Sequence, residues 1–216
     1  CKTQEKAVSI NAADLSKAIA RTPGTRSEKL TMYNTVLIPS VTYTLAQCFF
    51  TKPQLIRINK IYRQRIYSNC GYNRNTAGAI MEGPTYIGGA GFTPLYVLAS
   101  IGHVIHFLKH WRTPHDRAGK ILRCVTAWSQ YQAGTSISIL EDVTTDLSYM
   151  EGKFINAVRT TLQAIEGKIS ITPDFVLPPL RHGDLCIMEI PLLKSMNKLE
   201  QKKVSYCRLF LGVTYI

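Results

Sequence analysis

The residues that could carry catalysis in this 216-residue chain are few. Polymerase and nuclease chemistry needs carboxylates that lie close enough together to hold two metal ions. The only adjacent acidic pair, Glu141-Asp142, lies in a polar stretch and not in a Tyr-x-Asp-Asp sequence. The nucleophile and zinc signatures G-x-S-x-G and H-E-x-x-H are missing as well. We therefore expect no catalytic residue in this chain, and no cofactor or metal ion bound to it.

Three histidines offer a possible metal site. His103, His106 and His110 are spaced at i, i+3 and i+7, so they share one face of a helix. Zinc takes histidine ligands, but three histidines spread over this length converge poorly on a tetrahedron, and no nearby Cys or Glu completes the set. We interpret them as polar edge positions of a helix, close to phosphates alongside Lys109 and Arg112.

A glycine-rich stretch precedes these histidines and resembles a phosphate loop only in part. Gly83 and Gly88 have the spacing of a Walker loop, but Gly89 stands where the phosphate-binding lysine is required. Gly89-Ala-Gly91 begins a G-x-G-x-x-G pattern, but Pro94 takes the third glycine position. The stretch therefore predicts a turn that sets the following helix against the preceding one.

The charge distribution points to a polyanionic partner. The chain has 26 Lys and Arg against 14 Asp and Glu, a net charge of +12, and no acidic residue occurs from Lys29 to Met81. A basic face without carboxylates suits nucleic acid, although a solvated helix surface without a partner is the alternative. The residues that we expect to bind nucleic acid are Lys52, Arg57, Lys60, Arg63, Arg74, Lys109 and Arg112.

The helix from Pro53 to about Tyr67 is the main carrier of this charge. Its period predicts that Arg57, Lys60 and Arg63 project together into solvent without carboxylates to neutralise them. The residues predicted to face inward are Leu55, Ile58, Ile61, Tyr62 and Ile66.

The remaining pattern is also helical, and the fold class that we predict is mostly α, a multi-helix bundle with one or two short strands at most. Asn11 is the expected N-cap of a first helix, and Pro39 should break or kink a long one. No apolar run is long enough to span a membrane. The other expected elements are helices over 25–50, 95–111, 116–133, 147–165 and 184–212, the last with a break at Pro191, and a strand over 168–173. The apolar stripe from Leu147 to Ile165 is expected to be core. The 116–133 helix is expected to pack through Ile121, Leu122, Val125 and Trp128.

The cysteines and the chain ends indicate context. The six cysteines are far apart and form no C-x-x-C pair, which favours reduced thiols and an intracellular location, in the nucleus or the cytoplasm. The chain opens on Cys1 without an initiator Met and ends on an apolar helical pattern. We therefore expect it to be a piece of a longer protein.

The order of several short motifs resembles the region after the catalytic palm in reverse transcriptases of retrotransposons that lack long terminal repeats. A Pro-x-x-x-Tyr helix and a G-G-x-G turn recur there, in the thumb and the segment after it. The likeness covers roughly residues 24 to 216. The motifs that carry it are 37–43, 71–74, 83–92, 127–136, 181–188 and 207–212.

The resemblance implies a division into an N-terminal flank (1–23), a basic helical thumb-like region with the glycine turn (24–133) and a helical C-terminal region (134–216). It implies a parent RNA-directed DNA polymerase that uses Mg²⁺ in an upstream palm, and none of the catalytic aspartates of that palm falls in this chain. The expected function is to grip the template–primer duplex, with RNA or an RNA–DNA duplex as the partner. The alternative is a stand-alone helical module of a host protein that binds nucleic acid or another protein.

Overall fold

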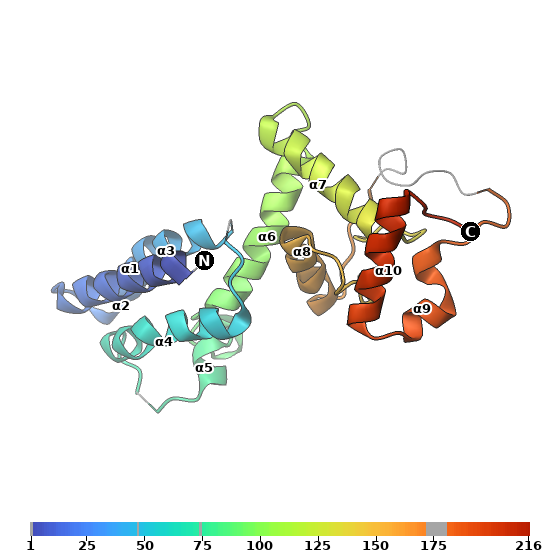
Figure 1. Ribbon diagram of the computed structural model, residues 1–216. Helices are drawn as coiled ribbons and strands as arrows, with labels where there is room; N and C mark the ends of the chain where they lie inside the picture. Colours follow the sequence, from blue (N-terminus) through green and yellow to red (C-terminus); the bar gives the residue numbers. More distant parts are fainter. Residues whose placement is uncertain (1, 47, 74, 172–180) are drawn as a thin grey trace. The chain divides into compact units, whose positions relative to one another are not determined.

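The computed structural model describes residues 2–46, 48–73, 75–171 and 181–216, and the chain is all-helical over these residues (Figure 1). The predicted fold class is confirmed. Within the described residues the extended pairing is limited to one isolated bridge between Cys186 and Tyr215. The chain divides into two compact units, Cys1–His103 and Val104–Ile216.

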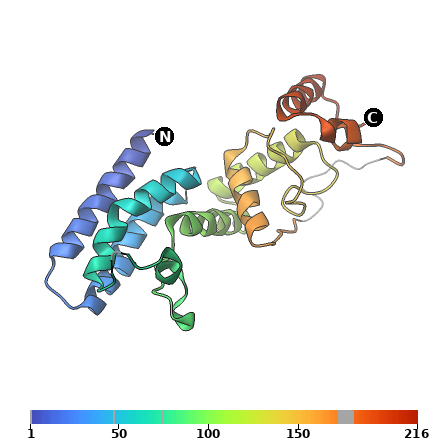
Figure 2. The ribbon, with the colours of Figure 1, turned by 90° about the horizontal axis from the view of Figure 1, so that it is seen from below.

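The first unit is a helical bundle built around the pairing of α1 (Lys2–Arg21) with α4 (Lys52–Asn69), which lie side by side in Figures 1 and 2. Because α1 begins at Lys2, Asn11 lies inside the helix and is not its N-cap, so that prediction was wrong. α1 contributes Val8, Ala12 and Ile19 to the core of this unit. The other elements are α2 (Arg26–Met32), α3 (Ile38–Leu45), α5 (Gly78–Glu82), a 3-10 turn (Thr85–Ile87) and the first part of α6 (Leu95–Trp111).

A π-helical segment, Tyr33–Leu37, joins α2 to α3, so the helical path continues past Pro39. Proline lacks the amide hydrogen that closes an ordinary helical turn. The π-helical turn just before Pro39 is a recognised kind of irregularity within a helix, and the chain stays helical on both sides of it. Tyr33 and Leu37 from this segment are buried in the core.

The glycine stretch forms a tight turn, as predicted. Gly88 and Gly91 have left-handed φ angles of 86° and 76°, which glycine adopts without strain. The amides of Ala90 and Phe92 donate to the carbonyls of Ile80 and Met81 at 2.8 and 2.9 Å. These bonds fold the chain back along α5 and place the Phe92 ring in the core, where it contacts Tyr33, Tyr67 and Tyr72.

The second unit contains the last part of α6 and four further α-helices among the residues described. α8 begins at Lys153 rather than near Leu147, so Leu147 and Met150 reach the core from the preceding loop. Ile165 is 66% exposed, because the helix has ended by that residue, and its predicted place in the core was wrong. The helices are α7 (Arg117–Ala133), α8 (Lys153–Ala164), α9 (Pro191–Ser195) and α10 (Lys198–Leu211).

Two other expectations for this unit need correction. Residues 168–171 form no strand, and residues 172 and 173 lie outside the described residues. The predicted helix over 184–212 is divided: a 3-10 turn (Ile187–Glu189) precedes Pro191, and a second break at Met196 separates α9 from α10. Asn197 then caps α10 by accepting hydrogen bonds from the amides of Leu199 and Glu200.

Candidate nucleic-acid interface

α4 carries four of the seven residues that the sequence predicts to bind nucleic acid, Lys52, Arg57, Lys60 and Arg63. Thr51 and Gln54 form a capping box at its start, and Pro53 lies in the first turn, where its missing amide hydrogen costs nothing. The inward face includes Leu55, Ile58, Tyr62 and Ile66, as predicted. Ile61 is 38% exposed, so its predicted inward position was wrong.

The structure brings three of the predicted cations together. Lys52, Lys60 and Arg63 line one open hollow of about 260 Å³ on α4, together with Tyr96 from the start of α6. The ammonium nitrogen of Lys52 lies 4.7 Å from the centroid of the Tyr96 ring. A cation over an aromatic ring is held in place while it stays accessible to solvent. Glu82 also lines this hollow, so its lining carries three cations and one carboxylate and is positive overall.

A second hollow of about 420 Å³ is lined by two of these three cations, Lys60 and Arg63. Its other lining residues are Gln64, Tyr67 and Thr76. Lys60 is exposed and forms no ion pair with any residue that the structure describes. The two hollows together extend the positive surface along more than two turns of α4. Side-chain amide and hydroxyl groups at the second hollow add neutral donors that suit phosphate oxygens.

Two of the arginines are not left unneutralised, contrary to our expectation. Arg57 donates to a carboxylate oxygen of Glu5 on α1 at 2.9 Å. The hydrogen bond from Arg57 is the main cause of the lowered pKa of Glu5. Arg63 lies 3.2 Å from a carboxylate oxygen of Glu82 and also packs over the ring of Tyr67. Arg57 thus links α4 to α1, and the positive charge of Arg63 is partly neutralised by Glu82.

Two of the other predicted binding residues belong to the second unit. Lys109, near the end of α6, and Arg112, just after it, are exposed and belong to the second unit. Arg74 lies outside the described residues. Among the described residues of the first unit, the candidate interface is therefore Lys52, Lys60 and Arg63.

The histidines of α6 do not form one polar edge. His103 is buried and stacks on Phe49, with ring centroids 5.6 Å apart. Burial lowers the pKa of His103, which favours its neutral form. The rings of His106 and His110 contact each other edge to face, with their centroids 4.4 Å apart. Among the described residues, no group of three or more His, Cys, Asp or Glu is arranged to hold a metal ion.

The acidic pair Glu141-Asp142 is used locally. Asp142 accepts hydrogen bonds from the amides and hydroxyls of Thr144 and Thr145, and Glu141 accepts one from the hydroxyl of Ser170. Burial alone raises the pKa of Asp142, but the bonds from Thr145 and Thr144 outweigh it and lower the pKa to about 2. The two carboxylates thus have separate hydrogen-bond partners.

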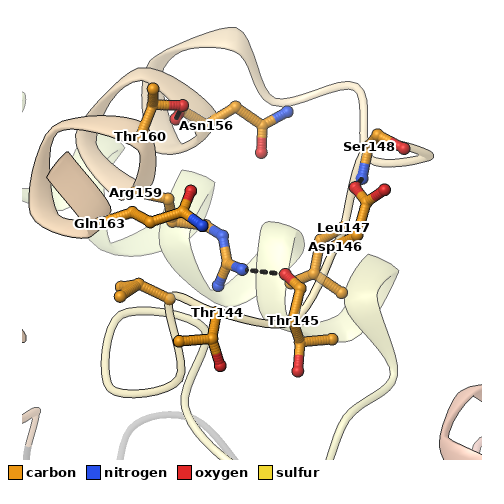
Figure 3. Close-up of a pocket in the computed structure, with 10 residues that line it drawn as sticks. Thr144, Thr145, Asp146, Leu147, Ser148, Asn156, Arg159, Thr160 and Gln163 are labelled. Carbon is orange, nitrogen blue, oxygen red and sulfur yellow. Dashed lines mark hydrogen bonds between the residues drawn. The ribbon is translucent and has the colours of Figure 1, made fainter.

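A hollow of about 430 Å³ in the second unit opens beside this loop (Figure 3). The Arg159 side chain, from α8, extends toward it, but its guanidinium donates to the backbone carbonyls of Ile139, Asp142 and Thr145. Figure 3 shows the bond to Thr145. Arg159 therefore fastens the loop to α8, and its donors are directed at protein carbonyls rather than into the hollow.

Sequence reasoning missed the neutral members of the α4 surface. Tyr96, Tyr67, Gln64 and Thr76 come from α4, α6 and the segment before α5. Tyr96 follows Lys52 by more than forty residues, so no local period connects them. An exposed lysine three residues before an apolar helical position gives no signal that an aromatic ring lies against it.

No protein-family model, curated protein or solved structure matches the chain. None of the described helices combines the length and the apolar character that crossing a lipid bilayer requires.

Proposed function

We propose that the first unit grips the backbone of a nucleic-acid duplex through Lys52, Lys60 and Arg63, as the thumb-like and post-polymerase segment of a retrotransposon reverse transcriptase. The observation that carries the proposal is the hollow on α4 that all three cations line together with Tyr96. Phosphate contacts of this kind set affinity and register and carry no sequence information. The catalytic carboxylates belong, in this proposal, to an upstream palm of the parent protein.

The positions of the cations support backbone binding rather than base readout. Lys52 and Lys60 lie on one side of α4, about two helical turns or ~12 Å apart along its axis. Their ammonium groups border the hollow of about 260 Å³, and ammonium groups contact phosphate oxygens as point charges. Such an arrangement suits the charged surface of a duplex and predicts similar affinity for unrelated sequences.

The test is a salt titration of duplex binding. A fluorescein-labelled RNA–DNA hybrid is titrated with the wild-type chain and with the double variant Lys52→Gln/Lys60→Gln, and binding is followed by anisotropy. Affinity falls as salt rises, with a log–log slope of about −0.9 for each phosphate neutralised. The double variant should therefore make the slope less steep by roughly 1.5–2. Arg63 is left intact because its ion pair with Glu82 supports the fold.

The matched control is Lys6→Gln/Lys17→Gln, which removes the same charge from exposed positions of α1. The control should keep the wild-type slope. Equal slopes for the wild type and the α4 variant would remove α4 from the interface. A strong preference for one duplex sequence over unrelated ones would instead favour a host-protein binding module.

A further inference from the structure

α7, in the second unit, has a face on which large apolar side chains are exposed to solvent. Ile121, Trp128 and Tyr131 are 63%, 57% and 36% exposed, and Cys124 between them is exposed as well. At 100° per residue these four positions form one stripe along the helix. The predicted packing of Ile121 and Trp128 into a partner helix was therefore wrong.

The side of α7 that faces the protein is largely polar, and its side chains hold neighbouring segments. Its buried residues include Leu122, Thr126, Ser129, Gln130, Gln132 and Ala133. The amide of Gln130 donates to the carbonyls of Thr135 and Ile137, and its oxygen accepts from the amide of Ile139. The hydroxyl of Ser205 on α10 donates to the carbonyl of Gln132. These buried bonds fix the rotation of α7 and leave its aromatic residues on the outside.

The two aromatic rings form an ordered surface. The ring centroids of Trp128 and Tyr131 are 5.9 Å apart, with their planes tilted by 43°. The guanidinium of Arg208 lies 5.3 Å from the Tyr131 centroid and is itself buried, with donors directed at the carbonyls of Tyr131 and Gln132. Tyr131 is thus held by a buried cation, and Trp128 lies beside it.

The charge on the same stripe is positive. α7 contains no acidic residue from Arg117 to Ala133, and Arg117 and Lys120 are exposed toward its beginning. At 1.5 Å per residue, Lys120 lies ~12 Å along the axis from Trp128. An exposed aromatic pair on the same helix face as two cations is a combination that suits single-stranded nucleic acid, since bases stack on the rings and phosphates meet the cations.

We propose that the outward stripe of α7 binds single-stranded nucleic acid, with bases stacked on Trp128 and Tyr131 and the backbone near Lys120 and Arg117. The site is separate from α4 and does not depend on the duplex interface proposed above. A protein partner would bury Ile121 as readily as the two rings. A single strand would use the rings and gain little from Ile121, so these positions separate the two kinds of partner.

The first experiment uses tryptophan fluorescence. The chain has two tryptophans, so Trp111→Phe leaves Trp128 as the only one. Addition of an oligo-dT twelve-mer at low salt should quench this fluorescence to saturation. The quench should persist when Lys52→Gln/Lys60→Gln is added to the same background. Loss of the quench in that combined variant would place the single strand on α4 and overturn the proposal, as would the lack of any quench.

The second experiment compares variants in the wild-type background by anisotropy of a labelled oligo-dT. Stacking on one ring corresponds to about 5- to 150-fold in affinity. Because Trp128 is partly covered, we expect Trp128→Leu to weaken binding at least about 5-fold by this relation, and Trp128→Phe to restore most of it. Ile121→Ala should change the affinity less than about 2-fold, because it removes no aromatic ring. Equal losses for Ile121→Ala and Trp128→Leu would refute stacking.

Discussion

Replacement of Gly89 by Ala tests the glycine turn directly. A Cβ on Gly89 would lie 2.1 Å from the carbonyl oxygen of Gly83 and 2.3 Å from its carbon. Non-bonded carbon atoms prefer about 3.5–4.0 Å, so the two ends of the turn must separate by roughly 1 Å. No flexible side chain can move aside, because the clash is with backbone.

The separation should disrupt the bonds that close the turn. The amide of Gly91 donates to the Gly83 carbonyl at 2.9 Å, and the amide of Phe92 donates to the Met81 carbonyl at 2.9 Å. Each such bond contributes about 0.5–1.5 kcal/mol. With a partial loss of the packing of Phe92, which is 2% exposed, we expect Gly89→Ala to cost about 2–4 kcal/mol of unfolding free energy.

The neighbouring glycine provides the control. A Cβ on Gly88 would meet no atom within 4 Å, and its cost is limited to the left-handed φ of 86°, about 1–2 kcal/mol. Urea unfolding followed by circular dichroism at 222 nm measures both variants. Tryptophan fluorescence gives a parallel reading for the second unit, where Trp111 and Trp128 both lie. A loss in Gly89→Ala no larger than that in Gly88→Ala would refute the backbone clash.

Two further predictions concern the second unit. Ile155 is fully buried, and Ile155→Ala should lower the unfolding free energy by about 2–5 kcal/mol. Ile165→Ala, at an exposed position, should change it by less than about 0.5 kcal/mol in the same fluorescence assay; similar losses would contradict the position at which α8 ends. The pKa of Asp142 is lowered from its ordinary value of 3.8 to about 2. Its stabilising effect is therefore present above the unfolded pKa and is lost as the pH falls from about 4 toward 2. Asp142→Asn should flatten the fall in melting temperature over that range, and an unchanged acid profile would contradict the role of its hydrogen bonds.

The sequence by itself determined most of the helices and the glycine turn, because their signals are local. Thr51, Gln54 and Pro53 mark the start of α4 within four residues, and the period of Leu55, Ile58 and Tyr62 defines its buried face. The same locality explains the errors. A residue type that favours N-caps, such as Asn11, carries no information about turns that precede it. An apolar residue such as Ile165 continues the period past the end of the helix.

Only the tertiary structure decided which cations form a surface and which face of α7 is exposed. Arg57 meets Glu5 and Lys52 meets Tyr96 across separations of more than forty residues. The pairing of α1 with α4 sets the first contact, and the second joins the start of α4 to the first turn of α6. Buried hydrogen bonds of Gln130 rotate α7 so that Trp128 points outward, against the preference of an indole for the core. Local periodicity records how apolar a residue is. It does not record which distant polar group will satisfy a buried amide, and that pairing decided which face of α7 is exposed.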